Sequence, residues 1–157
     1  MNKHSFRRAT AADAATVRDI THAAYAKWIP VIGRKPKPMT ADYDKAVVNN
    51  VIDLLEEDGR PIALIEMIPE LSFEPAHLLI ENIAVMPERH GKGIGSVLLE
   101  RAQTIARGFG VTEMRLYFHE KFAANHLFYA RRGFVEFARV PHPAGGEIVY
   151  MKKSIGA

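Results

Sequence analysis

The sequence contains no cysteine. Disulfide bonds, thiolate metal sites and cysteine nucleophiles are therefore excluded. The chain also lacks any apolar run close to the roughly 20 residues that a membrane helix needs. Its opening segment, MNKHSFRRAT, lacks the apolar run of a secretory signal. We therefore expect a cytoplasmic protein with no membrane partner.

Positive and negative charges are nearly balanced. The 157 residues carry 21 Lys and Arg against 18 Asp and Glu, a formal net charge of +3, and the isoelectric point is near 9.2. The basic residues are scattered, apart from the segment GRKPKP at 33–38. This balance is compatible with an anionic ligand and argues against nucleic acid as a partner. The length suits a single domain over residues 1–157, with room for a substantial core.

Hydrophobic periodicity predicts the secondary structure. Apolar side chains recur at helical spacing in residues 11–29, 41–51, 94–109 and 123–132. Patterns typical of strands occupy residues 4–10, 51–57, 60–68, 78–86, 113–118, 134–140 and 147–153. Thr10 and Thr40 are expected to cap the first two helices, with Asp13 completing a capping box at the first. Asp58-Gly59 predicts a tight hairpin.

The element order is β-αα-βββ-α-β-α-ββ, which predicts an α/β (α+β) fold. The strand–helix–strand segment between residues 78 and 118 implies a parallel pair joined by a crossover. The hairpins on either side of this segment imply antiparallel pairing. We expect a mixed, mostly antiparallel central sheet of about seven strands, flanked by about four helices.

Three glycines, Gly91, Gly93 and Gly95, lie between a predicted strand and a predicted helix. The first amides of a helix lack internal partners and attract anions, so the loop is a candidate phosphate site. A P-loop is excluded because Met86 stands where its first glycine belongs. A dinucleotide fingerprint fits poorly because Ser96 replaces the third glycine. The alternative is a helix start that needs glycine for packing.

The segment ENIAVMPERHGKGIGSVLLERA, residues 81–102, resembles the coenzyme A signature of the GNAT N-acetyltransferase superfamily. That signature joins a strand ending in xAVxP to Q/R-x-x-G-x-G/A and a long helix. The family topology also matches the predicted element order over nearly the whole chain. The resemblance implies acetyl-CoA as co-substrate and no metal, with pyrophosphate on the loop amides and pantetheine along the strand. The implied cofactor-binding residues are Ile83, Ala84, Val85, His90, Gly91, Lys92, Gly93, Ile94, Gly95 and Ser96.

One position departs from the family pattern. His90 stands where the family has glutamine or arginine, and Arg89 lies one residue early. A cradle of backbone amides tolerates this difference. The histidine does, however, remove the side-chain contribution that glutamine or arginine makes in the family. Lys92 could add attraction for phosphates, although a lysine in a loop is more often simply solvated.

A second motif, NHLFYARRGF at residues 125–134, resembles the family pattern N-x-x-L/F-Y-x-x-x-G-F. The resemblance implies that Tyr129 protonates the sulfur of coenzyme A and that Asn125 binds the cofactor. Many members of the family carry asparagine seven residues before the tyrosine, where this chain has Phe122. The alternative is that Tyr129 is a core residue of an amphipathic helix.

Acetyl transfer to an amine requires a base, because a lysine-like ammonium has a pKa near 10.4. The resemblance implies Glu81, acting directly or through water, and the backbone N–H of Val85 as the oxyanion donor. Glu66 on the preceding strand and His119, whose ordinary pKa lies near neutrality, are the other candidates. Glu81 could equally be a solvated or ion-paired carboxylate.

The acceptor amine is expected to enter beside the segment AYAKWIPVIGRKPKPMTADY at residues 24–43. The candidate substrate-binding residues there are Tyr25, Trp28, Arg34, Met39 and Tyr43. Arginine suits bidentate pairing with a carboxylate, so we expect a primary amine of a small molecule or amino acid, acetylated by direct attack in a ternary complex. The alternatives are aromatics that merely fix the loop, a non-catalytic acyl-CoA-binding module, and an acetyltransferase of protein lysines or N-termini. The closing strands could supply a homodimer interface.

Overall fold

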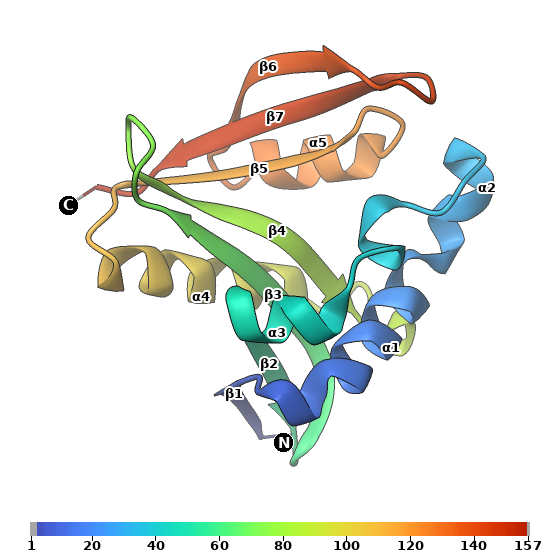
Figure 1. Ribbon diagram of the computed structural model, residues 1–157, viewed down its shortest axis with the longest axis vertical. Helices are drawn as coiled ribbons and strands as arrows, with labels where there is room; N and C mark the ends of the chain where they lie inside the picture. Colours follow the sequence, from blue (N-terminus) through green and yellow to red (C-terminus); the bar gives the residue numbers. More distant parts are fainter. Residues whose placement is uncertain (1–2, 157) are drawn as a thin grey trace. The chain divides into compact units, whose positions relative to one another are not determined.

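The computed structural model describes residues 3–156. The strands are β1 (His4–Arg8), β2 (Val51–Glu57), β3 (Arg60–Glu70), β4 (His77–Val85), β5 (Glu113–His119), β6 (Val135–Pro141) and β7 (Glu147–Ser154) (Figure 1). The α-helices are α1 (Ala14–Tyr25), α2 (Ile29–Ile32), α3 (Tyr43–Asn49), α4 (Ile94–Gly108) and α5 (Ala123–Ala130). Short 3-10 helices are η1 (Ala11–Asp13), η2 (Ala26–Trp28), η3 (Lys37–Met39) and η4 (Pro87–Arg89).

The strands form a seven-stranded sheet in the order β1-β2-β3-β4-β5-β7-β6. Pairs β1–β2, β2–β3, β5–β7 and β6–β7 are antiparallel. Strands β4 and β5 are parallel, with Leu78–Ile80 opposite Met114–Leu116. The prediction of a mixed, mostly antiparallel sheet is therefore confirmed, including the crossover through α4.

The chain divides into two compact units. The first comprises the residues up to Ile68 together with Glu81–Ala102, and the second comprises residues 69–80 and the chain from Gln103 onward. In the described part of the chain, no helix is long and apolar enough to span a membrane.

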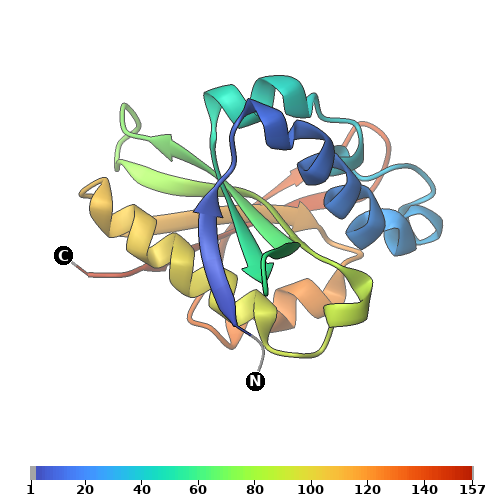
Figure 2. The same cartoon turned by 90° about the horizontal axis from the view of Figure 1, so that it is seen from below.

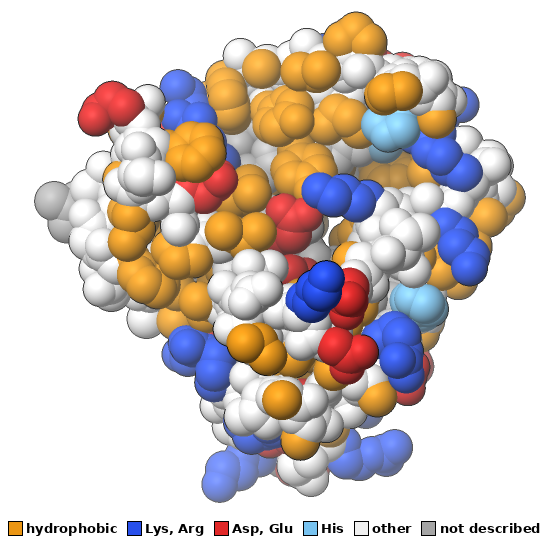
Figure 3. Space-filling view, in the orientation of Figure 1, with side chains coloured by type: hydrophobic (Ala, Val, Ile, Leu, Met, Phe, Trp, Pro, Cys, Tyr) orange, Lys and Arg blue, Asp and Glu red, His pale blue; other side chains and the backbone are white. Residues whose placement is uncertain are grey.

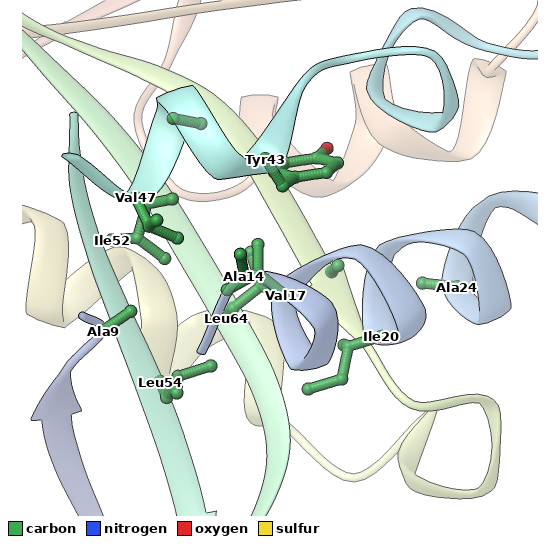
Figure 4. Packing of buried hydrophobic residues seen from close by; sticks show 12 residues of the cluster. Ala9, Ala14, Val17, Ile20, Ala24, Tyr43, Val47, Ile52, Leu54 and Leu64 are labelled. Carbon is green, nitrogen blue, oxygen red and sulfur yellow. The ribbon is translucent and has the colours of Figure 1, made fainter. Parts of the chain in front are cut away.

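The core of the first unit lies between two helices and the strands β2, β3 and β4. Side chains from α1 and α3 point toward those of β2 and β3 (Figure 4). The cluster comprises Ala9, Ala14, Val17, Ile20, Ala24, Tyr43, Ala46, Val47, Ile52, Leu54, Leu64 and Ala84. The α1 members follow helical spacing, and the β2 members alternate along the strand, as one buried face of each element requires.

The other face of β2 carries a buried carboxylate. Ile52 and Leu54 face the helices α1 and α3, so Asp53 between them faces the opposite side. There Arg8 Nε donates to Asp53 Oδ1 at 2.6 Å, and Arg101 Nε, from α4, donates to Oδ2 at 2.7 Å. Figure 2 shows α1 and α3 on one side of β2 and β3 and α4 on the other. This ion triad fixes the middle of α4, at Arg101, against β1 and β2.

The hairpin between β2 and β3 is the one that the sequence predicted. Asp58 and Gly59 both have positive φ, at 50° and 83°. Such angles at two successive residues belong to the type I′ turn, whose twist matches that of paired strands. The capping interaction at Thr10 is also confirmed, since its backbone N–H donates to Asp13 Oδ2 at 2.8 Å.

Two local predictions about the first helices were wrong. The segment 11–29 is not one helix but a succession of η1, α1, η2 and the start of α2, which ends at Gly33 in a left-handed conformation with φ of 77°. Thr40 does not cap the next helix. Asp42 does, because its side chain accepts from the Lys45 N–H at 3.3 Å, and Asp is among the strongest N-cap residues.

Candidate active site

The glycine loop connects η4 to the first turn of α4. Gly91 and Gly93 have φ of 74° and 79°, in the left-handed region that disfavours other residues. A Cβ added at either glycine would meet no atom within 4 Å. Backbone conformation, and not tight packing, is therefore what requires glycine at these two positions. Their conformation leads the chain into a helix of 15 residues, whose first amides and dipole favour an anion.

His90 ties this loop to the end of β4. Its Nε2 lies 2.7 Å from the carbonyl oxygen of Val85, and its Nδ1 lies 3.4 Å from Lys27 Nζ. Because the lysine ammonium can only donate, Nδ1 accepts its hydrogen bond. Nε2 therefore carries the ring proton and donates a hydrogen bond to the Val85 carbonyl oxygen. The residue that departs from the family pattern thus shapes the loop through the main chain of β4.

A second anchor precedes the loop. Arg89 Nη2 donates to Glu57 Oε1 at 2.6 Å, and His4 Nε2 lies 3.0 Å from Glu57 Oε2. Glu57 ends β2, so the pair holds η4 against the edge of the β2–β3 hairpin. No local sequence pattern pairs residues 32 positions apart, and this anchor could not be predicted.

Strand β4 is longer than the ladder that it forms with β5. In the described part of the chain that ladder covers Leu78–Ile80, whereas β4 extends to Val85. Met86 N–H donates to Ile62 O of β3 at 2.9 Å, and Tyr25 OH donates to Ile83 O at 3.1 Å. The backbone from Glu81 to Val85 therefore lies outside the β4–β5 ladder.

A pocket of about 350 Å³ lies within the first unit. It is lined by Lys37, Pro38, Ala41, Asp42, Tyr43, Lys45, Ala46, Asn49, Asn50, Glu66, Ile68, Glu81 and Asn82. These residues come from η3, α3, β3, β4 and the segments beside them. On the face shown in Figure 3, acidic side chains lie in a central hollow close to basic side chains. The pocket thus joins the predicted base to the segment predicted to bind the acceptor.

The two glutamates of the pocket have different surroundings. Glu81, with 18% of its side chain exposed, forms an ion pair of 3.2 Å between its Oε1 and Lys37 Nζ. Glu66 is 4% exposed and accepts from Asn50 Nδ2 at 2.8 Å. Burial raises the pKa of Glu66, and the negative charge of Glu81 raises it further.

Tyr43 is the one member of the predicted acceptor group that lines the pocket within residues 3–156. Its buried hydroxyl donates to Pro38 O at 2.6 Å, and burial raises its pKa above the ordinary tyrosine range. The other four lie elsewhere. Tyr25 bonds the β4 backbone, and Arg34 Nη1 donates to Ile32 O at 3.4 Å within its own loop. Lys27 lies over the Trp28 ring, and Met39 is buried.

Tyr129 lies on α5 in the second unit. Its ring packs against Phe118 and Phe134, with centroids 5.7 Å away in both cases. Tyr129 is half-buried, and within the described residues its hydroxyl makes no hydrogen bond. Burial raises the pKa of Tyr129 to about 12. The phenol is therefore protonated at neutral pH and available as a donor. Asn125 lies on the first turns of the same helix.

His119 has both ring nitrogens occupied inside the second unit. Nδ1 accepts from the Lys121 N–H at 3.1 Å, so Nε2 carries the proton and donates to Gly145 O at 3.1 Å. A Cβ on Gly146 would lie 2.5 Å from the His119 ring. These contacts give the histidine a structural role in the β6–β7 hairpin. Among residues 3–156, no group of three His, Asp or Glu side chains is placed to hold a metal ion.

The model of the acetyltransferase (GNAT) family matches residues 17–134. The chain therefore belongs to this family, and the prediction of an acetyl-CoA-dependent acetyltransferase is confirmed. A search of curated proteins found no match.

Solved structures share the fold at low sequence identity. PaiA N-acetyltransferase from Thermoplasma acidophilum, solved with coenzyme A, has 19% identity and a TM-score of 0.76, over 97% of this chain and 99% of that one. YncA, a putative acetyltransferase from Salmonella typhimurium solved with acetyl-CoA, has 21% identity and a TM-score of 0.75, and the match covers 99% of this chain and 95% of that one. The ribosomal-protein-S18-alanine N-acetyltransferase from Escherichia coli has 19% identity and a TM-score of 0.73, and the match covers 99% of this chain and 96% of that one. These proteins share the architecture of this chain.

Proposed function

We propose that the protein transfers an acetyl group from acetyl-CoA to a primary amine of a small molecule, by direct attack within a ternary complex. The observation that carries this proposal is the pocket of about 350 Å³ that contains Glu81 and Glu66. A concave site of this size, with convergent polar groups and a carboxylate of raised pKa, is a candidate site for a small ligand.

Coenzyme A binds along β4 and on the glycine loop. The amides from His90 to Ser96 hold the pyrophosphate, supported by the α4 dipole and by the charge of Lys92. The pantetheine arm pairs with the backbone of Ile83–Val85, which lies outside the β4–β5 ladder. Asn125 adds a side-chain contact from α5.

Glu81 accepts the proton that the acceptor ammonium must lose. The free amine then attacks the thioester carbonyl carbon, forming a C–N bond. The resulting oxyanion receives a hydrogen bond from the Val85 N–H. The nitrogen of the tetrahedral intermediate then loses its second proton to solvent, and collapse of the intermediate breaks the C–S bond and releases the amide and the thiolate. Solvent removes the proton from Glu81 at the end of the cycle.

Tyr129 completes the proton balance at sulfur. The leaving thiolate, whose conjugate thiol has a pKa near 8.5, takes a proton at neutral pH. The Tyr129 hydroxyl has no other hydrogen-bond partner in the described chain and remains protonated, because burial raises its pKa to about 12. It donates to the sulfur as the C–S bond breaks and regains its proton from solvent.

The test is release of free thiol from acetyl-CoA against a panel of small amines, amino acids and peptides. Amine-dependent release with small acceptors supports the proposal. Activity confined to peptide or protein amines contradicts the small-molecule acceptor. Thermal stabilisation by coenzyme A with no thiol release across the panel supports instead a non-catalytic acyl-CoA-binding module.

A further inference from the structure

The pocket contains hydrogen-bond acceptors that lack matching donors. Glu66 and Asn82, from β3 and β4, are 4% and 3% exposed, and both line the pocket with Glu81. The Asn82 Oδ1 atom is buried and, within residues 3–156, has no hydrogen-bond partner. Buried polar atoms in native proteins are nearly always paired, so an unpaired oxygen beside a pocket points to a ligand.

The orientation of the Asn82 amide follows from its neighbours. Its Nδ2 lies 3.3 Å from the Tyr43 hydroxyl and 3.1 Å from Thr21 Oγ1. Tyr43 has one hydroxyl hydrogen, which goes to the carbonyl of Pro38 at 2.6 Å. Tyr43 must therefore accept from the Asn82 NH₂ group, and the unpaired atom is the carbonyl oxygen. What this oxygen needs is an N–H or O–H donor.

Glu66 needs a donor as well. Asn50 Nδ2, at 2.8 Å, is its one hydrogen-bond partner in the described chain. The nearby charge of Glu81 opposes its ionised form, while Lys37 favours it more weakly. Lys37 is 70% exposed and forms its ion pair with Glu81. A cation bound beside Glu66 would supply the charge that this carboxylate lacks.

The geometry at Glu81 shows what this pocket accepts. The Lys37 ammonium lies 3.2 Å from Glu81 Oε1, so this carboxylate already holds a protonated amine. Glu66, Glu81 and the unpaired carbonyl of Asn82 repel a ligand carboxylate and attract N–H groups. Of the two lysines in the lining, Lys37 and Lys45, the first is already paired with Glu81. A volume of about 350 Å³ lies at the lower end of the range of small-ligand pockets, roughly 300–1,000 Å³. A short aliphatic diamine fits within it.

We propose that the acceptor carries a second protonated nitrogen, that Glu66 and Asn82 bind this nitrogen, and that Glu66 determines specificity for it. The inference rests on the proposed function, because it takes Glu81 as the group beside the reacting amine. Asn82 contributes the carbonyl oxygen, and Glu66 contributes the charge.

The test compares three acceptors of matched length: butane-1,4-diamine, butylamine and 4-aminobutyrate. We expect kcat/KM to be about 30-fold higher for the diamine than for butylamine, as one charge-assisted hydrogen bond provides, and lowest for 4-aminobutyrate. Glu66→Gln should lower the diamine-to-butylamine ratio about 30-fold, toward unity. Glu100→Gln, which removes an exposed carboxylate of α4, is the matched control and should leave the ratio unchanged.

Three results would overturn the inference while leaving the acetyltransferase proposal intact. These are equal kcat/KM for diamine and butylamine, an unchanged ratio in folded Glu66→Gln, and activity restricted to acceptors outside the matched set. A preference for 4-aminobutyrate would instead assign a carboxylate site to the pocket lysines. If no amine causes thiol release, the proposed function fails. Calorimetric titration of the same three compounds into coenzyme A-bound protein then tests the diamine site on its own. Preferential binding of the diamine, lost in Glu66→Gln, supports the inference, and its absence overturns it.

Discussion

Two buried carboxylates on neighbouring strands have opposite surroundings. Asp53 on β2 is fully buried and receives one guanidinium on each oxygen, from Arg8 and Arg101. Glu66 on β3 is 4% exposed and receives one neutral amide, from Asn50. A buried charge that is fully paired holds structure together, whereas one that is incompletely paired marks a binding site. The contrast separates the ion triad that fixes α4 from the pocket.

The largest expected effect is loss of stability at Asp53. Asp53→Ala leaves two guanidiniums without their partner and should lower the free energy of unfolding by about 3 kcal/mol. Urea denaturation followed by circular dichroism measures this loss. The diamine-to-butylamine ratio of the folded variant should stay at the wild-type value. A loss below about 1 kcal/mol would mean that the triad behaves as a surface ion pair.

The next largest effect is on turnover at Tyr129, whose hydroxyl makes no hydrogen bond within the described residues. Tyr129→Phe removes the hydroxyl and keeps the ring that packs on Phe118 and Phe134. We expect kcat to fall about 100-fold, with the affinity for coenzyme A unchanged by calorimetry. Unchanged turnover would remove Tyr129 from the mechanism.

Glu66→Gln should have a smaller, pH-dependent effect on stability. The folded protein raises the pKa of Glu66, so between the ordinary pKa of about 4.3 and the raised value the folded state holds more protons than the unfolded state. Wild-type stability therefore falls as pH rises through this window. The glutamine variant lacks this dependence, so its stability relative to wild type should increase from pH 4 toward neutral pH. Parallel stability curves for the two proteins would contradict the raised pKa.

The smallest effect is expected at His90. His90→Ala removes the hydrogen bond to Val85 O and should weaken coenzyme A binding about fivefold, as one neutral hydrogen bond provides. His90→Arg tests the same position from the other direction. Unchanged affinity in that variant would show that the main chain holds the phosphates, and tighter binding would show that the family side chain contributes.

Periodicity and turn chemistry predicted most of the fold. Apolar residues at helical spacing in α1 and α4 and the Asp58-Gly59 turn are local signals, and the structure confirms them. The cap at Asp42 was missed because Thr40, two residues earlier, is also a good cap, and only the backbone geometry distinguishes the two. The break after Tyr25 was missed because the apolar pattern continues beyond it.

The candidate site was less accessible to sequence reasoning. The glycine loop and the strand before it form one continuous segment, so a motif could identify them. The pocket brings together residues between Lys37 and Asn82, and no spacing rule joins Asn50 to Glu66 or Asn82 to Tyr43. Glu66 was noted as a reserve base, but its burial and its missing counter-charge are tertiary facts. Asn82, next to the favoured Glu81, carried no signal in the sequence.

The most direct test of acetyl transfer in this pocket is thiol release from acetyl-CoA with butane-1,4-diamine, compared between wild type and Glu81→Gln. The proposed mechanism predicts amine-dependent release by the wild type. It also predicts a fall in kcat of about 100-fold or more in the variant, with coenzyme A affinity unchanged. Equal rates in the two proteins, or binding of coenzyme A with no release by the wild type, would contradict it.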